Sequence, residues 1–504
     1  MHKNPVIVYI SVLLVAFFPI WGHIDELPIQ LWDESRLAMN AYEMYKDHNF
    51  LTTHFNGQPD MWNTKPPLLV WLQVLSFNIF GVSELALRLP SALAGTLTCL
   101  LLFWFFYKKM KSPITGIVSV IALVTSYGYI KYHHSVRSGD YDAMLTMFVS
   151  GTAIFYYLYI DENKQKYLSL SIFCIILAVM TKSVTGLFII PTLLLYTLYA
   201  RKLRQVLTSK SLYIGIAAFI MVVGAYYYFA EKNNPGYIAQ VQFNELGGRF
   251  VDLADNIGET RPAFYFYLLK EKDFAFWVLL LPISAILGFY AVDKRQKNIT
   301  VMATLAIVTI FTIISQATTK KDWYDMPLLP FLSILVAVGV NSICNMLGKL
   351  KVWDGVTTQN ILPLAFVLLI STPPYYDAVM SSMYPDPGNW IKNNTNMCRY
   401  LKDIYHGNIH LTKPLVIVKD KYDANIDWYV KVLRDKNVDI STITYKEIRP
   451  KQLVLVYDNE IKKKIEENLV SFAGEKNYDG DLVRYFVDGD KKQDSTINSR
   501  TGIQ

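Results

Sequence analysis

Long, almost uncharged apolar segments recur along the chain, and they constrain its fold more than any other feature. Hydrophobic residues make up 52% of the 504 positions, and they come in blocks too long for the core of a soluble domain. Because a bilayer offers no water to backbone polar groups, such segments cross it as helices. The sequence therefore predicts a polytopic α-helical membrane protein, with about eleven spans near residues 6–24, 87–107, 114–132, 143–160, 167–181, 184–200, 212–230, 274–292, 299–317, 325–347 and 360–375.

One apolar block, Pro67 to Gly81, is too short to be counted among the spans. It is about fifteen residues long and opens with two prolines, which favours a helix that lies in the membrane interface. If it does not cross and the N-terminus is cytoplasmic, every short basic loop falls on the cytoplasmic side, as the positive-inside rule requires. These loops read KKMKS, DENKQK, RKLRQVLTSK, DKRQKN and GKLK.

The same topology gathers acids and scattered cations on the opposite, external face. The predicted arrangement is a transmembrane domain over residues 1–375, with an external loop 25–86 that carries interfacial helices. The charged residues that share this face are Asp33, Glu34, Arg36, Lys65, Arg137, Asp140, Asp142, Lys182, Lys320 and Lys321. Charges at a membrane surface are costly unless they take part in chemistry or have a charge partner.

The composition changes to a soluble pattern from about residue 376. Short β-rich runs such as PLVIVKD and KQLVLVYD alternate with helical spacing, so residues 376–487 are expected to form a small external α/β domain. Residues 488–504 are polar and are expected to be a disordered tail. The sequence has no basic stripe interleaved with aromatic residues, so nothing in it indicates a nucleic-acid partner.

The acids have two readings. Asp33 or Glu34 could act as a general base toward a hydroxyl or amine, or could cap the helix that follows over residues 35–47. Asp140 and Asp142 could orient an acceptor, hold a divalent cation or pair with Arg137. Capping accounts easily for one of these two acids but not for both.

The cations also have two readings. Lysines at helix ends usually extend toward the membrane surface, and this alone would explain Lys182, Lys320 and Lys321. Together with Lys65 and Arg36, however, they form a cluster that fits an anionic phosphate or pyrophosphate. The adjacent His133 and His134 are typical of a membrane interface, with metal ligation as the less favoured alternative; the neighbouring Trp62, Trp323 and Tyr324 are typical of an aromatic belt.

Several motifs in order resemble those of a known enzyme class. They read DES-R, N-G-x-P, KPPLL-x-W, FGVSE-x-A-x-RLPSALAG, G-x-x-D before a helix, TKS-x-x-G and K-x-x-W-Y-x-x-P-x-x-P, over residues 28–335. The order is similar to that of the GT-C class of membrane glycosyltransferases, in the branch with the aminoarabinose lipid A transferase and the protein O-mannosyltransferases. The resemblance implies a GT-C fold with about 11–13 spanning helices.

The resemblance implies roles for individual residues. Asp33 matches the catalytic acid that deprotonates the acceptor, and Lys65 matches the lysine that contacts the lipid phosphate, with Arg36 close enough to assist. Asp142 matches the second acidic position, and Asp140 is an additional acid. The remaining candidates are Glu34 among the acids and, for the donor phosphate, Lys182, Lys320, Lys321 and Arg137.

The implied reaction is inverting transfer of a sugar from a polyprenyl-phosphate donor to lipid A, protein or a cell-surface glycan. It would take place on the periplasmic or external side of the plasma membrane. Where lipid A transferases carry Glu-Lys-Pro, this chain has Thr64 before Lys65 and Pro66, so metal dependence is not implied and a divalent ion stays open. Two alternatives stay open: a ligase that uses a pyrophosphate-linked glycan, and a transporter or flippase of lipid-linked sugars.

Overall fold

The computed structural model describes residues 5–131, 133–251, 261, 263–349, 361–386, 391–477 and 481–490. The chain divides into two compact units. The first, here called the membrane unit, comprises Met1–Ile24 and Asn40–Pro385. The second, here called the C-terminal unit, comprises Asp25–Met39 and Asp386–Gln504. Helix α2 (Asp33–Asp47) crosses the boundary between them.

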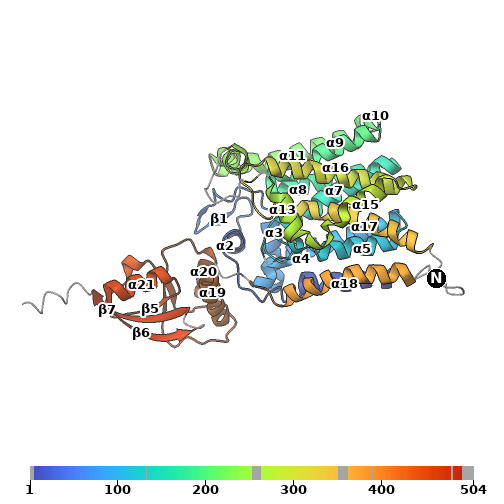
Figure 1. Ribbon diagram of the computed structural model, residues 1–504. Coiled ribbons are helices and arrows are strands. Elements are labelled where there is room, and N and C mark those ends of the chain that lie inside the picture. Colours follow the sequence, from blue (N-terminus) through green and yellow to red (C-terminus); the bar gives the residue numbers. More distant parts are fainter. Residues whose placement is uncertain are drawn as a thin grey trace, which may run out of the picture. The chain divides into compact units, whose positions relative to one another are not determined.

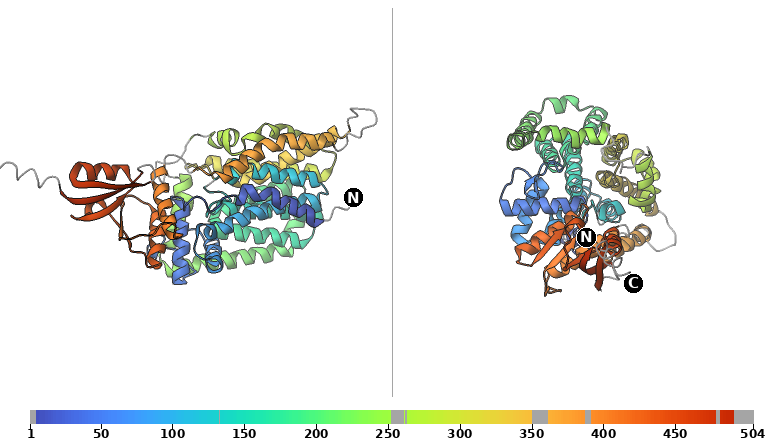
Figure 2. Two further views of the ribbon diagram at one scale, coloured as in Figure 1. Left: turned by 90° about the horizontal axis from the view of Figure 1, so that it is seen from below. Right: turned by 90° about the vertical axis from the view of Figure 1, so that its left-hand side faces the viewer.

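The membrane unit is helical, and its long helices run side by side (Figures 1 and 2). Its helices are α1 (Pro5–Trp21), α3 (Leu68–Phe80), α4 (Glu84–Trp104), α5 (Pro113–Val124), α6 (Tyr127–Ile130), α7 (Asp142–Glu162), α8 (Gln165–Lys182), α9 (Ile190–Tyr199), α10 (Leu203–Leu207), α11 (Lys210–Asn233), α12 (Tyr237–Val241), α13 (Phe264–Leu268), α14 (Ala275–Val278), α15 (Leu280–Phe289), α16 (Lys294–Gln316), α17 (Leu329–Leu347) and α18 (Ile361–Met383). A two-residue hairpin joins β1 (His54–Phe55) to β2 (Gln58–Pro59).

Seven helical segments in the described part of the chain are long and apolar enough to cross a membrane. Five shorter apolar helices accompany them, among them α3, which has 13 residues. At 1.5 Å per residue α3 is about 20 Å long, less than the roughly 30 Å of a bilayer core. Its length therefore agrees with the interfacial helix predicted for this block.

The spans differ from their predicted bounds where the backbone is interrupted. The predicted span 184–200 is a 3₁₀ turn, η2 (Ser183–Leu187), followed by the short α9, which has Pro191 in its first turn. The predicted span 274–292 is likewise divided into α14 and α15. Helix α18 continues through Pro373 and Pro374 to Met383, so the C-terminal unit resumes at Asp386 rather than at about residue 376.

Small residues let the helices of the membrane unit approach closely. Helix α7 packs on α8 and α4, and α17 packs on α5 and α15. A Cβ added at Gly339 of α17 would lie 2.0 Å from Ser284 Oγ of α15, so only glycine fits there. Because lipid provides no hydrophobic driving force between helices, such close van der Waals packing contributes much of the free energy of their association.

The C-terminal unit contains a five-stranded sheet of order β4-β3-β5-β7-β6. Strand β3 is parallel to β4 and β5, whereas β7 is antiparallel to β5 and β6. The elements are α19 (Lys392–Tyr405), β3 (Leu415–Val418), α20 (Ala424–Asp435), β4 (Ile440–Ile443), β5 (Gln452–Val456), α21 (Asn459–Asn468), β6 (Leu469–Asn477) and β7 (Leu482–Asp490). Residues 488–490, predicted to start the disordered tail, belong to β7, and 491–504 lie outside the described residues.

The core of this unit follows the strand alternation. Val418 and Val456 pair in register and pack with Ile461 and Ile465 of α21. Their neighbours Ile417 and Leu455 are also buried and point to the other face, on the side of α19 and α20.

Candidate active site

The beginning of α7 and the end of α8 bring a buried acid and a buried lysine together. Lys182 Nζ lies 2.5 Å from Asp142 Oδ1, and both side chains are almost fully buried. Helix α8 ends at Lys182 because Ser183 takes a positive φ of 51°. The imidazole of His134 lies 3.1 Å from Asp142 Oδ2 and stacks on Trp323 with ring centroids 3.6 Å apart. The acid is thus held between a lysine and a histidine.

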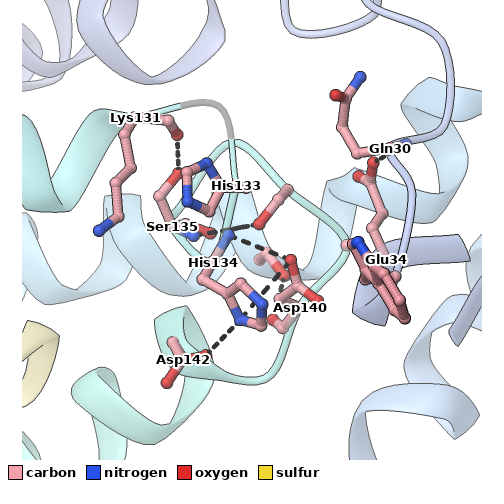
Figure 3. Close-up of polar contacts among 12 residues, drawn as sticks. Gln30, Glu34, Lys131, His133, His134, Ser135, Asp140 and Asp142 are labelled. Carbon is pink, nitrogen blue, oxygen red and sulfur yellow. Dashed lines mark hydrogen bonds and ion pairs between the residues drawn. The ribbon is translucent and has the colours of Figure 1, made fainter. Parts of the chain in front are cut away.

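The second acid of this region contacts the same histidine. Asp140 Oδ2 accepts a hydrogen bond of 3.1 Å from the backbone N–H of His134, which therefore lies between Asp140 and Asp142 (Figure 3). Helix α7 begins at Asp142, and its cap residue Tyr141 makes no side-chain cap bond. Asp142 thus contacts Lys182 and His134, and Asp140 contacts the backbone of the same histidine.

Lys65 meets an acid that the sequence did not indicate. Its Nζ lies 3.4 Å from Glu245 Oε1 and 5.5 Å from the ring centre of Tyr141. Glu245 is buried and belongs to a π-helical segment, η3 (Gln242–Val251). That segment has no charge pattern or periodicity that distinguishes Glu245 from a solvated acid, so no sequence signal could have found it.

The polar residues before Lys65 hold its loop in place. Asn63 Nδ2 donates to Asn40 Oδ1 at 2.8 Å and to the Tyr141 hydroxyl at 2.9 Å. Asn40 also donates to Asp60 Oδ2 at 2.9 Å. This buried network fixes the loop that presents Lys65.

Three members of these two ion pairs, all but Lys65, line one narrow cavity. Asp142, Lys182, Glu245 and Tyr324 contribute to its wall, and the remaining lining residues are Leu145, Thr185, Phe188, Ile314 and Ala317. Its volume is about 20 Å³, which is near the size of a single water molecule. A phosphate could enter only if these side chains move; Lys182 lies in the wall, and Lys65 reaches it through its ion pair with Glu245.

Three other predicted cations have different surroundings. Arg137 donates to the carbonyl oxygens of four residues, Pro19, Ile20, Gly22 and Ser382, and its contacts are structural. Burial, with nearby Arg88, lowers the pKa of Arg137 to about 10. Lys320 Nζ donates to Ala317 O at 2.8 Å, at the end of α16. The backbone carbonyl of Lys321 accepts a bond of 3.1 Å from the Tyr265 hydroxyl.

A separate charged group surrounds Lys131. Its Nζ lies 3.5 Å from Asp273 and 3.7 Å from Asp322, and Asp325 is completely buried nearby. Burial lowers the pKa of Lys131, but the carboxylates outweigh this and raise it above its usual value. Burial and the charge of Asp273 raise the pKa of Asp325. His133 Nε2 lies 3.6 Å from Asp322, so this histidine belongs to the Lys131 group.

Asp33, Glu34 and Arg36 lie in the C-terminal unit. Helix α2 begins at Asp33, two residues before the predicted start, and Asp33 is exposed. Glu34 is buried, and its Oε2 accepts a bond of 2.7 Å from the backbone N–H of Gln30 (Figure 3). It thereby fixes residues 25–32, here called the lead segment. The grouping of these three residues with Lys65 and Lys182 stays a prediction.

Among the described residues, no group of three or more histidines, cysteines or acids could hold a metal ion. The metal-ligand alternative for His133 and His134 therefore lacks the three-ligand group that a protein metal site needs among the described residues.

Comparisons with known proteins agree with the helical architecture. Residues 64–228 match the family of dolichyl-phosphate-mannose-protein mannosyltransferases. A protein of Aquifex aeolicus (strain VF5) is 27% identical over 73% of this chain and 70% of its own length. The undecaprenyl phosphate-alpha-4-amino-4-deoxy-L-arabinose arabinosyl transferase of Aeromonas salmonicida (strain A449) is 26% identical over 62% of this chain. That alignment covers 56% of the Aeromonas protein, a little over half of its length.

A solved structure extends the likeness to nearly the whole chain. The crystal structure of ArnT from Cupriavidus metallidurans bound to undecaprenyl phosphate matches with a TM-score of 0.68 at 14% sequence identity. The match covers 96% of this chain and 98% of that one, so the fold is shared from the first helices to the C-terminal sheet. The chain therefore shares the fold of this membrane transferase, and its residues 64–228 are similar to the mannosyltransferase family.

Proposed function

We propose that the protein transfers a sugar from a polyprenyl-phosphate donor to an acceptor on the external side of the membrane, with inversion at the anomeric carbon. The observation that carries the proposal is the single cavity wall that contains both Lys182 and Glu245, the partner of Lys65. The wall contains Lys182 directly, and Glu245 links it to Lys65, so two cations lie close to one space. The Aeromonas relative is named as a transferase of an undecaprenyl phosphate-linked sugar, which supports this donor class.

In this reaction the acceptor hydroxyl or amine loses its proton to Asp33 and attacks the anomeric carbon. The bond from that carbon to the phosphate oxygen breaks, and the lipid phosphate leaves with the electron pair. The leaving group already carries negative charge, so catalysis requires mainly a base and positive charge beside the departing oxygen. Lys65 and Lys182 supply that charge, and Arg36 assists.

The two acidic partners of the lysines have different roles, and only Glu245 occupies the position proposed for the phosphate. Glu245 neutralises Lys65, and Asp142 neutralises Lys182, at 3.4 and 2.5 Å. A lipid phosphate that enters displaces Glu245 from Lys65. Asp142 is held additionally by His134, so it stays in place and orients Lys182. Asp140 contacts the same histidine, and its proposed role is to orient the acceptor.

The external location rests on the basic loops. Five short loops rich in lysine and arginine are assigned to the cytoplasm by the positive-inside rule, which leaves Lys65, Asp142 and Lys182 on the external side. The acceptor is a lipid A, a protein or a cell-surface glycan. Mass spectrometry of cell-envelope glycans with and without the gene identifies which of them depends on this chain.

Lys65→Ala tests the donor site. We expect undecaprenyl phosphate to bind at least tenfold more weakly, because a charge-assisted contact to phosphate contributes roughly 1.5–3 kcal/mol. Binding of the purified variant is measured by titration in detergent, with Lys109→Ala as the control, since Lys109 pairs with Glu162 outside the cavity. Equal affinity of Lys65→Ala and the unchanged protein would refute the assignment.

A further inference from the structure

The lead segment, which comes immediately before Asp33, is held by helices α19 and α20 of the same unit. Lys402 Nζ donates to the carbonyl oxygens of Asp25 and Glu26, the second at 3.0 Å. The Ile29 N–H donates to the Tyr429 hydroxyl at 3.2 Å. Side chains of the soluble domain thus satisfy backbone groups of a segment almost 400 residues earlier in the sequence.

The helix side of this contact is itself fixed by a buried network. Asn425 Nδ2 donates to Ile29 O at 3.3 Å and to Asn394 Oδ1 at 2.6 Å. Asn394 donates to Asp423 Oδ1 at 2.7 Å, and Tyr457 donates to Asp423 Oδ2 at 2.5 Å. Because Tyr457 follows strand β5 directly, the network connects the lead segment to the end of the sheet.

The last residue of the lead segment has a constrained backbone. Trp32 takes a φ of +76°, which is rare for a bulky side chain. Its ring stacks on Tyr422 at 5.4 Å, and its carbonyl oxygen accepts from Ser35 Oγ and from the N–H of Arg36. A strained residue persists only where its surroundings determine its conformation, and such residues gather at functional sites. The strain here lies directly beside Asp33.

From these contacts we infer that the C-terminal domain positions the Asp33 carboxylate for catalysis by holding the lead segment. Lys402, Asn425, Tyr429 and Tyr422 are positioning residues, because they contact the lead segment rather than the reacting atoms. This inference rests on the proposed role of Asp33 as the base. It gives the soluble domain a function in turnover, through the backbone that ends at the first turn of α2.

The test uses the full-length protein with Tyr429→Phe, which removes only the hydroxyl that accepts from Ile29. We expect hydrogen exchange at the Ile29 amide to become faster. We also expect formation of the gene-dependent glycan to fall about tenfold or more, since small displacements of catalytic groups have effects of this size. Undecaprenyl phosphate should bind as tightly as before. Lys402→Met should act in the same direction.

Tyr485→Phe is the matched control. Its hydroxyl donates to Glu466 at 2.6 Å, away from the lead segment, so this variant should change neither exchange at Ile29 nor turnover. Faster exchange in Tyr429→Phe with unchanged turnover would overturn the inference, and so would unchanged exchange. Asp33→Asn separates the two proposals. Full turnover in Asp33→Asn would refute the role of Asp33 as the base. An inactive Asp33→Asn together with a fully active Tyr429→Phe would refute only the positioning role of the C-terminal unit.

Discussion

The ion pair between Lys65 and Glu245 gives the sharpest test of how a lipid phosphate enters the site. At 3.4 Å, two unit charges attract by about 5 kcal/mol at an effective dielectric constant of 20. Glu245 is 1% exposed and Lys65 16% exposed, so desolvation of the buried carboxylate offsets much of this attraction. After this offset, the ion pair opposes phosphate binding by a net free energy of about 1–2 kcal/mol. Glu245→Gln should therefore bind undecaprenyl phosphate about 5- to 30-fold more tightly.

The assay is titration of the purified variant with undecaprenyl phosphate at two salt concentrations. Glu162→Gln is the control, because Glu162 also pairs with a lysine, Lys109 at 2.9 Å, but lies outside the cavity. Affinity should rise only in Glu245→Gln, and combining it with Lys65→Ala should abolish the gain. Weaker binding in Glu245→Gln would mean that Glu245 supports the site rather than competing with the phosphate, and would refute the displacement step.

Three further predictions concern the base, the Lys131 group and the topology. Asp33→Asn should abolish turnover while undecaprenyl phosphate still binds, measured by product formation and titration; near-normal turnover would make Asp33 a helix-terminal acid only. Because the pKa of Asp325 is raised, its contribution to stability is greatest below its usual pKa of 3.8 and declines as pH rises. At pH 8, Asp325→Asn should therefore unfold at a higher temperature than the unchanged protein, and this difference in unfolding temperature should become smaller toward pH 4. A difference that does not change with pH would contradict the prediction. In a background without the four native cysteines, a cysteine at Ser83 should react with an impermeant reagent in intact cells, and a cysteine at Ser112 only after permeabilisation. The reverse labelling would place Lys182 in the cytoplasm.

The sequence predicted that Asp142 and Lys182 share one face of the membrane, because both lie at helix ends, but it did not predict that they pair. Asp142 starts one helix and Lys182 ends the next, and consecutive helices joined by a short turn are antiparallel neighbours. Their ends therefore meet on the same side of the membrane unit, and the structure brings the two charges to 2.5 Å. Helix periodicity and topology are sufficient for this kind of prediction.

Other contacts depend on tertiary packing, which periodicity does not encode. Glu245 reaches Lys65 from an irregular π-helical segment. Arg137 follows the same histidine motif as Asp140, yet its guanidinium extends to carbonyl oxygens at the ends of α1 and α18. The fit of one guanidinium to several carbonyls depends on where two distant helices end, and no local pattern specifies that.

The structure also separates two buried charge groups that look alike in sequence. Around Lys131, the three carboxylates of Asp273, Asp322 and Asp325 face one lysine, and the raised pKa of Asp325 favours a proton on that acid. A group neutralised in this way has little positive charge left for a phosphate. Lys182 has the single acid Asp142 at 2.5 Å and lines the cavity itself. Its acid is also held by a histidine, so the pair can keep its geometry while the lysine turns toward an entering anion. The cavity beside Lys182 is therefore the reason for proposing the Lys182 group as the site of chemistry, whereas the three carboxylates around Lys131 leave no excess of positive charge there for a phosphate.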